Sequence, residues 1–403
     1  MKKTHYAWFV CLGCAMILFC TSGLAINAFT VYQPYILKLN GFTNAQTSSI
    51  ITVRSLFAFL SMFLTGFYYQ RLSYRAGLAG SGMMMAFAFL LFGLAKSYAA
   101  YCIAAATAGL AYGVGTMIPI TILLERWFVQ KRTLAIGICS ASTGLSTLGI
   151  PSLITALIEK TSLRTAFVSE AGLIALLAAG SFLLLRSDPS QKQLEPYGQA
   201  GTAGATGKKE ASSERFLPGK TWILLVPMLL FLGAVTSTGY SHLSVLANGE
   251  GFPPQTVALA ITVSGLALTG GKLLYGALTE RIGIRCCNWL FGILMILGLV
   301  LLCTCTGSTA LLMAGMLLYG CGLAFTTVGM TAWALDLSAP EQQERTVRYF
   351  QIGHSGGGLL FSSLPGILAD RFGGSYVPAY LFFIFCALFV LLAIQGIYRK
   401  SVY

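Results

Sequence analysis

The sequence has little charge. Only 10% of its 403 residues are Asp, Glu, Lys or Arg, and only 13 are acidic, whereas soluble domains carry about 25% charged residues. Histidine is also scarce, with 3 residues, while 56% of the chain is hydrophobic. This composition excludes a disordered chain, a small disulfide scaffold and an ordinary soluble enzyme. It is typical of a protein that crosses a membrane several times.

What the sequence does contain is a series of long apolar blocks. A membrane core about 30 Å thick requires about 20 mostly apolar residues per helix. Charge-free stretches of this length, with further apolar blocks around Arg54 and from Thr165 to Leu185, predict an all-α membrane protein of twelve transmembrane helices. The repeated motifs described below divide them into two pseudo-symmetric six-helix bundles. The expected spans are 7–31, 47–69, 76–95, 98–124, 133–157, 165–185, 220–246, 256–279, 286–304, 309–335, 346–368 and 376–398.

Lys and Arg are distributed unevenly between the connecting segments. With both termini in the cytoplasm, nineteen of them lie on the cytoplasmic side and five on the other, as the positive-inside rule requires. We therefore expect a multi-pass protein of the cell membrane with cytoplasmic termini. The longest hydrophilic stretch lies in mid-chain, and it predicts an N-terminal bundle over 1–186, a cytoplasmic linker over 187–219 and a C-terminal bundle over 220–403.

Two short motifs occur once in each half of the chain. The stretch from Tyr112 to Gly115 (Tyr-Gly-Val-Gly) recurs 207 residues later as Tyr-Gly-Cys-Gly, beginning at Tyr319. The stretch from Gly66 to Arg71 recurs 210 residues later, beginning at Gly276. Nearly equal offsets indicate a repeat of six helices. Repeats of this kind, with a site between the halves, are the architecture of alternating-access transporters.

At these residues the chain resembles the major facilitator superfamily over its whole length. The loop motif of that family, Gly-x-x-x-Asp-Arg/Lys-x-Gly-Arg-Arg/Lys, reads Gly-Phe-Tyr-Tyr-Gln-Arg-Leu-Ser-Tyr-Arg here, without the acid and the second glycine. The second copy keeps an acid and the glycine. The resemblance implies a gating role for the matching residues of both copies, which are Gly66, Arg71, Arg75, Gly276, Glu280 and Arg281.

A second segment is similar to one branch of that family. Residues 126–138 look like the Arg-Trp-Phe…Arg-x-Leu-Ala-x-Gly-Ile segment of the oxalate:formate antiporter and monocarboxylate transporter group, and we assign Arg126 and Arg132 to the gating loops. That group has a buried Arg in span 8, where this chain has Lys272. Its antiporters have a Lys in span 11, where this chain has His354. Both positions keep a possible cation with different geometry and basicity.

Two bases lie inside the expected spans. A lysine at the centre of a membrane helix costs about 2.5–3.5 kcal/mol, so Lys272 is expected to face a cavity, a partner or the interface. We favour a role in anion binding or coupling over snorkelling to the interface. It lies on a stripe of small and polar residues, Gly265, Thr269, Lys272, Gly276 and Thr279.

Arg54 lies in span 2 on a polar stripe with Thr47 and Ser61. Its planar guanidinium suits a carboxylate, and an ion pair with Glu170 in span 6 is an equal alternative. Glu170 is the one acid inside the expected spans. Its two alternative roles are a structural ion pair and titration during coupling.

Further candidates are polar residues of apolar spans. His354 shares a helix face with Gln351 and can bind an anion, relay protons or bond to a neighbouring helix. Tyr112 and Tyr319 accompany the repeated glycines, where close packing is the alternative, and His242 is expected to cap or pack. The candidate substrate-binding residues are Arg54, Lys272, His354, Gln351, Tyr112, Tyr319, Asn27 and Tyr240, and the coupling candidates are Glu170 and His354.

The sequence predicts a secondary transporter that moves a small organic anion, a mono- or dicarboxylate, by anion exchange or proton symport. Two bases against one acid inside the spans argue for an anion. A proton-driven exporter of drugs or metabolites and a non-transporting sensor with the same fold are the alternatives.

No enzymatic site is expected. The stretch around Lys272 fails as a phosphate-binding loop, because Leu266 replaces its first glycine and Leu273 its Ser or Thr. We expect no cofactor and no metal, and read the eleven cysteines as packing residues. The net charge of +13 reflects the Lys and Arg residues that orient the protein in the membrane, and it does not indicate nucleic-acid binding. The expected partners are the anion, protons in the case of symport, and the lipid bilayer, around a monomer.

Overall fold

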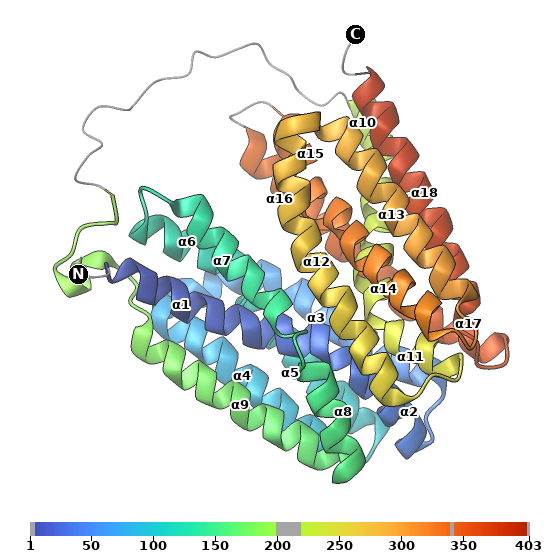
Figure 1. Ribbon diagram of the computed structural model, residues 1–403. Coiled ribbons are helices and arrows are strands. Elements are labelled where there is room, and N and C mark those ends of the chain that lie inside the picture. Colours follow the sequence, from blue (N-terminus) through green and yellow to red (C-terminus); the bar gives the residue numbers. More distant parts are fainter. Residues whose placement is uncertain (1–4, 199–218, 339–341, 401–403) are drawn as a thin grey trace. The chain divides into compact units, whose positions relative to one another are not determined.

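The fold is almost entirely helical. The computed structural model describes residues 5–198, 219–338 and 342–400 (Figure 1). Within these residues, 11 helical stretches are long and apolar enough to cross a membrane, which confirms a multi-pass, all-α membrane protein. The stretches are Ala7–Asn40, Asn44–Arg71, Tyr74–Leu94, Tyr98–Trp127, Ala135–Lys160, Leu163–Leu184, Thr221–Gly239, Pro254–Thr279, Ile284–Thr304, Thr309–Asp336 and Val377–Arg399.

The expected span 346–368 is not among these 11 stretches. It is built from two shorter helices, α16 (Gln343–Leu360) and α17 (Leu364–Arg371). The first turns of α16 carry Arg345 and Arg348, which lower its hydropathy. Pro365 lies in the first turn of α17, a position where proline is favoured because its missing N–H needs no helical partner.

Helix breaks recur at matching places in the two halves of the chain. The first and seventh expected spans contain the π-helical turns η1 (Phe19–Asn27) and η5 (Ala234–Gly239). The fourth breaks at residues 115–116, and the tenth contains the π-helical η6 (Phe325–Gly329). The fifth and eleventh spans are also interrupted, whereas the remaining six are single helices. This pattern agrees with the six-helix repeat.

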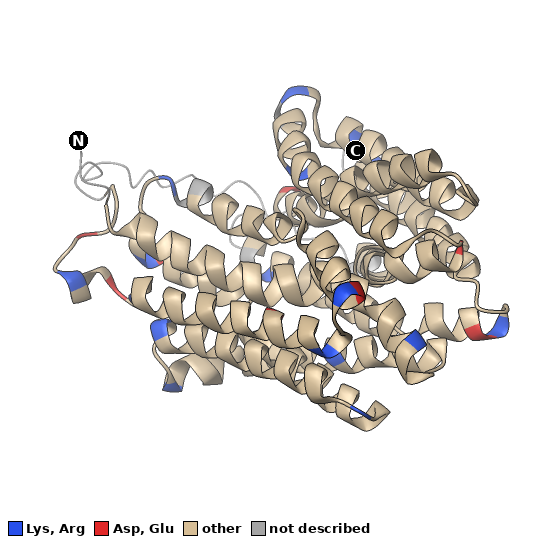
Figure 2. Ribbon diagram, turned by 60° about the horizontal axis from the view of Figure 1, so that its bottom comes forward, with Lys and Arg blue, Asp and Glu red and all other residues tan. Residues whose placement is uncertain are grey.

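The other helices have regular geometry. Charged side chains lie mostly at helix ends and in connections, as Figure 2 shows for Lys, Arg, Asp and Glu. The remaining helices are α1 (Ala7–Leu18), α2 (Gln33–Asn40), α3 (Asn44–Arg71), α4 (Tyr74–Leu94), α5 (Tyr98–Val114), α6 (Met117–Trp127), α7 (Arg132–Leu145), α8 (Ile150–Lys160), α9 (Leu163–Leu184), α10 (Gly219–Gly233), α11 (Leu243–Gly249), α12 (Pro254–Ile282), α13 (Ile284–Thr304), α14 (Thr309–Ala324), α15 (Met330–Asp336) and α18 (Val377–Lys400).

The chain forms two compact units. In unit 1, α4 packs against α5 and α9, and α1 packs against α6, α7 and α9. In unit 2, α14 packs against α12 and α13, and α10 packs against α16 and α18. The domain boundaries expected from the sequence stay a prediction. Unit 1 is Met1–Ala28, Leu56–Ser146 and Leu157–Ser212, and unit 2 is Phe29–Ser55, Thr147–Ala156 and Ser213–Tyr403.

The repeated Tyr-Gly-x-Gly motif marks one helix crossing in each unit. A Cβ atom on Gly113 of α5 would overlap the Ser61 hydroxyl of α3. A Cβ atom on Gly320 of α14 would overlap the Ser264 carbonyl of α12. Glycine therefore lets these helices touch, as small residues do in membrane bundles.

We expect Gly113→Val and Gly320→Val each to destabilise the protein, because overpacking a close-packed interior costs about 1–3 kcal/mol. The measurement is thermal unfolding of the purified protein. Gly270→Val is the matched control, since a Cβ atom at Gly270 has open space around it. Equal unfolding temperatures for all three variants would contradict the packing role.

Candidate functional site

The π-helical turn η5 accepts hydrogen bonds from side chains of other helices of unit 2. The Tyr319 hydroxyl of α14 donates to the Val235 carbonyl at 2.7 Å. The Tyr380 hydroxyl of α18 donates to the Gly239 carbonyl, also at 2.7 Å. Turns of this kind are frequent at functional sites, so η5 is the centre of the candidate site.

Three buried polar atoms near η5 have no hydrogen-bond partner among the described residues: Tyr240 Oη, Ser264 Oγ and His354 Nε2. Tyr240 directly follows the turn. The His354 carbonyl lies against Gly233, which directly precedes it. The Ser264 backbone lies against Gly320, next to Tyr319. Buried polar groups are normally paired, so these three atoms lack the partners that such groups usually have.

Gln33 is a further residue of unit 2 whose buried side chain lacks partners. Its side chain, at the start of α2, is 1% exposed, and both its amide oxygen and its amide nitrogen lack a partner in the described part of the chain. Helix α2 packs against α11, shortly after η5. The sequence marks Gln33 only as a weaker candidate of the same type as Asn27 and Tyr240, because its burial depends on this packing.

Arg54 is buried in the part of α3 that belongs to unit 2. Its side chain is 8% exposed, and its Cζ atom lies 5.3 Å from the centroid of the Phe29 ring. An arginine stacked on a ring directs its N–H groups outward in the guanidinium plane, a geometry that suits a carboxylate.

Lys272 is partly buried in α12, but its predicted polar stripe is only partly realised. Gly265 lies against Thr147, whereas a Cβ atom at Gly276 would meet open space. The Thr269 hydroxyl donates to the carbonyl of Gly265, one turn earlier. The stripe is therefore not a continuous polar surface, since its hydroxyls are satisfied within the helix.

The remaining predicted site residues are spread over both units. Gln351 is exposed on α16, and Tyr112 is partly buried in α5 of unit 1. Glu170 is buried in α9 of unit 1. Because Arg54 belongs to unit 2, the ion pair with Glu170 stays a prediction. The side chain of Asn27 lies outside the described residues.

The loop motif ends on an arginine that makes equivalent contacts in both units. Arg75 Nε donates to the Phe182 carbonyl of α9 at 2.8 Å, and its guanidinium lies 4.0 Å from the Phe182 ring centroid. Arg285 donates to the Tyr398 carbonyl of α18 and lies 5.9 Å from the Tyr398 ring centroid. Each arginine thus ties the loop to the last helix of its half of the chain.

The other motif residues are more exposed. Arg71 lies over the Phe67 ring at 4.3 Å, and Arg126 lies over the Tyr74 ring at 4.7 Å. Both arginines therefore contact the face of an aromatic ring. Gly66, Gly276 and Arg281 are exposed, and the side chains of Glu280 and Arg132 lie outside the described residues.

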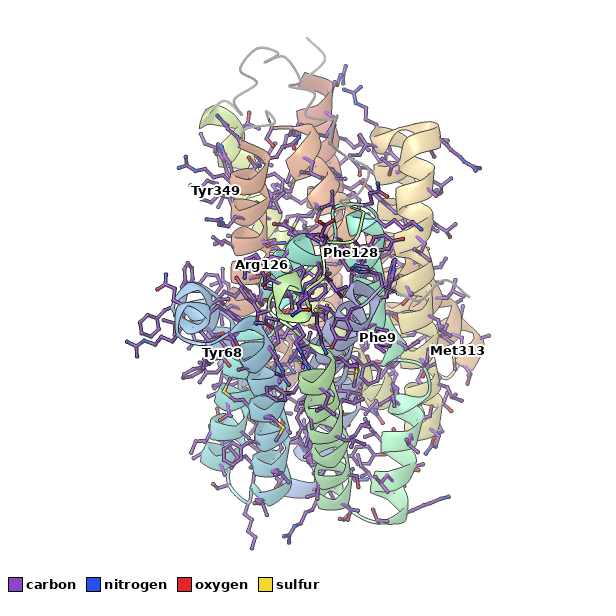
Figure 3. All side chains as sticks on the ribbon, turned by 90° about the vertical axis from the view of Figure 1, so that its left-hand side faces the viewer. Phe9, Tyr68, Arg126, Phe128, Met313 and Tyr349 are labelled. Carbon is purple, nitrogen blue, oxygen red and sulfur yellow. The ribbon has the colours of Figure 1, made fainter. Side chains whose placement is uncertain are left out.

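The first part of the expected linker is bound to unit 1. The Tyr197 N–H donates to the Trp127 carbonyl at 2.8 Å, and the Tyr197 carbonyl accepts from Val129 at 3.0 Å. Its ring packs against Trp8 and Phe128. Figure 3 labels Phe128 beside Arg126, at the end of α6. The described start of the linker is therefore attached to unit 1 through Tyr197.

His242 has more contacts than its sequence position indicated. Its Nε2 atom lies 3.0 Å from the Ser48 hydroxyl, and its Nδ1 atom lies 2.9 Å from the Thr238 carbonyl. A carbonyl only accepts, so Nδ1 carries a hydrogen and, in the neutral ring, Nε2 accepts from Ser48. No sequence pattern marks this pair, because 194 residues separate its members.

The sequence of this chain matches the family described as the Major Facilitator Superfamily over residues 15–308 and 243–400. The chain belongs to the Major Facilitator Superfamily. Membership confirms the resemblance noted from the loop motifs, and it indicates a secondary transporter of a small molecule rather than an enzyme. The two halves of this chain resemble each other in the positions of their helix breaks and in the contacts of Arg75 and Arg285.

Relatives within the superfamily have diverse names. The chain is 23% identical to the aspyridones efflux protein of Emericella nidulans over 91% of its own length and 73% of that protein's. It is 23% identical to monocarboxylate transporter 12 of Rattus norvegicus, covering 68% of this chain and 61% of that one. It is 22% identical to the oxalate:formate antiporter of Oxalobacter formigenes, covering 68% and 64% respectively.

Solved structures of the superfamily share the fold. The nucleoside transporter NupG has a TM-score of 0.75 and 16% identity, over 98% of this chain and 100% of its own. A D-xylose-proton symporter has a TM-score of 0.72 and 12% identity, over 95% and 96%. These likenesses establish the superfamily fold and leave the substrate open.

We expect Tyr319→Phe and Tyr380→Phe each to destabilise this transporter by about 1–3 kcal/mol, because each leaves a buried carbonyl of η5 without its donor. Thermal unfolding of purified protein measures the effect. Tyr349→Phe is the matched control, since the Tyr349 hydroxyl accepts from Arg345 on the exposed surface of α16. Figure 3 labels Tyr349 on that helix. No difference between the three variants would contradict the bracing of η5 by the two hydroxyls.

Proposed function

We propose that this transporter moves a small organic carboxylate across the cell membrane by alternating access. The observation that carries the proposal is the pair of bases Arg54 and Lys272, both in apolar helices of unit 2. A base inside a membrane is costly, and an anionic substrate would offset part of that cost. Both bases therefore favour a carboxylate over a cation or a neutral solute.

The unpartnered polar groups near η5 favour the same ligand. The Tyr240 hydroxyl, the Ser264 hydroxyl and the Gln33 amide nitrogen are donors, and His354 Nε2 is a donor in one tautomer. A carboxylate offers about four acceptor positions on its two oxygens. The donor-rich group around η5 therefore complements a small carboxylate.

The rest of the working cycle is part of the proposal. Both termini lie in the cytoplasm, the halves divide at the linker 187–219, and the protein works as a monomer. The loop residues Gly66, Arg71, Arg75, Gly276, Glu280, Arg281, Arg126 and Arg132 form the cytoplasmic gate. Proton coupling, where it occurs, uses His354 or Glu170.

Two kinds of relative bear on the substrate. The names monocarboxylate transporter 12 and oxalate:formate antiporter favour a carboxylate. The aspyridones efflux protein, aligned over 91% of this chain, favours the second candidate, which is export of a metabolite. The unpartnered donors support the carboxylate, which we therefore propose over export of a metabolite.

A ligand screen tests the substrate class first. Purified protein is heated with mono- and dicarboxylates, hydrophobic cations and neutral metabolites in parallel. We expect stabilisation by one or more carboxylates, because ligand binding to the folded state raises the unfolding temperature. Stabilisation by hydrophobic cations alone would contradict the anion proposal.

We expect Lys272→Gln to lower counterflow of the stabilising carboxylate by about tenfold in proteoliposomes, the effect of losing a charged hydrogen bond of about 1.4 kcal/mol or more. Lys272→Arg keeps the charge and should retain part of the flux. Lys160→Gln is the matched control, because Lys160 is exposed at the end of α8. Carboxylate counterflow at the wild-type rate in Lys272→Gln would contradict the proposed role of this base.

A further inference from the structure

One face of α3 joins distant parts of the chain within unit 2. Asn44, Ser48 and Thr52 follow one another at intervals of four residues, and such residues share a helix face. Each bonds to a side chain from the C-terminal part of the chain. The pairs are Asn44 with Asp370 and Tyr376, Ser48 with His242, and Thr52 with Ser362 and Ser363.

The outermost pair completes the cap of α3. The local sequence Thr43-Asn44-Ala45-Gln46 forms a capping box, in which the Thr43 hydroxyl accepts from the Gln46 N–H at 3.1 Å and the Gln46 side chain accepts from the Thr43 N–H at 3.0 Å. The box leaves the Asn44 and Ala45 N–H groups for an acceptor from elsewhere. Asp370 is that acceptor, at 3.0 and 2.8 Å.

Asp370 makes this contact as a carboxylate. One of its oxygens accepts from both the backbone and the side-chain amide of Asn44, and the other accepts from Ala45. Burial raises the pKa of this carboxyl, but the hydrogen bonds from Ala45 and Asn44 outweigh burial and lower it. An anion at a helix N-terminus is also favoured by the helix dipole.

Backbone packing holds the same segments together. A Cβ atom on Gly366 of α17 would overlap the Asn44 carbonyl and the Ser48 hydroxyl. α17 therefore lies directly against α3, and Ser48 is 0% exposed beneath it. Separating α17 from α3 must expose Ser48.

We propose that Asp370 and the N-terminus of α3 form a reversible latch that closes the α2, α11 and α17 end of unit 2 (Figure 1). Asp370 and Asn44 lie at the rim, where water can replace each bond when the latch opens. The inner pairs are neutral hydroxyl and imidazole contacts, which cost little to separate. The Lys and Arg distribution predicts this end to face away from the cytoplasm. The inference rests on the proposed alternating access and is independent of the substrate.

Labelling of an engineered cysteine tests the latch without any substrate. Ser48→Cys is introduced, the protein is placed in nanodiscs, and a charged maleimide is added. Mass spectrometry of the peptide that contains residue 48 keeps the eleven native cysteines out of the measurement. We expect Asp370→Asn to raise the labelling rate about threefold, the size expected from losing an exposed charged contact.

Gly366→Ala is the second variant, and it should raise the rate of labelling at residue 48 through the backbone overlap without changing any charge. Two matched controls should leave that rate unchanged. Asp188→Asn removes a carboxylate that accepts the Ser190 N–H at a helix start in unit 1. Gly396→Ala adds a methyl group where there is open space.

Equal labelling in the parent and in both latch variants would overturn the latch. Loss of folded protein in either variant, seen by size-exclusion chromatography, would also overturn it, because the contact would then be a structural cap. If no carboxylate were transported, the labelling result would still stand, so failure of the substrate proposal and failure of the latch are distinguishable.

Discussion

Inside a bilayer no water is present to bond a backbone group, so each peptide N–H and C=O has to find its partner within the protein. A regular helix meets this demand alone, but a helix that widens or breaks does not. In unit 2, Tyr319 and Tyr380 donate to carbonyls of η5. In unit 1, the Thr21 hydroxyl of η1 donates to the Gly115 carbonyl, where the fourth span breaks, at 3.0 Å. Side chains of neighbouring helices thus stabilise the breaks, and the breaks define where the site lies.

The sequence was informative wherever a property depends on local composition. Long apolar blocks predicted the spans, because burial in lipid demands about 20 apolar residues whatever the neighbours are. The repeated glycines predicted close crossings, and Gly113 and Gly320 do lie at equivalent ones. The breaks were not foreseen, since η5 depends on hydroxyls from α14 and α18. The residues around Lys272 were predicted as a stripe of small and polar residues, and the structure adds that the Thr269 hydroxyl is satisfied one turn earlier in its own helix.

Scarcity of acids shapes the connections of this transporter. With 26 bases and 13 acids, carboxylates cannot pair with every base. Aromatic rings and backbone carbonyls take their place, as Phe182 does for Arg75 and Tyr398 does for Arg285. A cation over an aromatic face contributes about 0.5–1 kcal/mol at exposed sites, less than a buried ion pair but without the cost of burying an acid. The loops can therefore be held together without an internal anion that would compete with the carboxylate that we propose as the substrate.

Two sets of polar groups in unit 2 differ in whether they have hydrogen-bond partners. Along the α3 face that carries Asn44, Ser48 and Thr52, each polar side chain has a partner, and the helix cap is completed by Asp370. Around η5, the buried polar atoms of Tyr240 and His354 have none among the described residues. A protein that only needed stability would pair both sets, because an unsatisfied buried group costs about 1–3 kcal/mol. Pairing at the end and not at the site agrees with the two proposals: the latch has its partners within the protein, whereas the ligand that we propose would supply the partners that the site lacks.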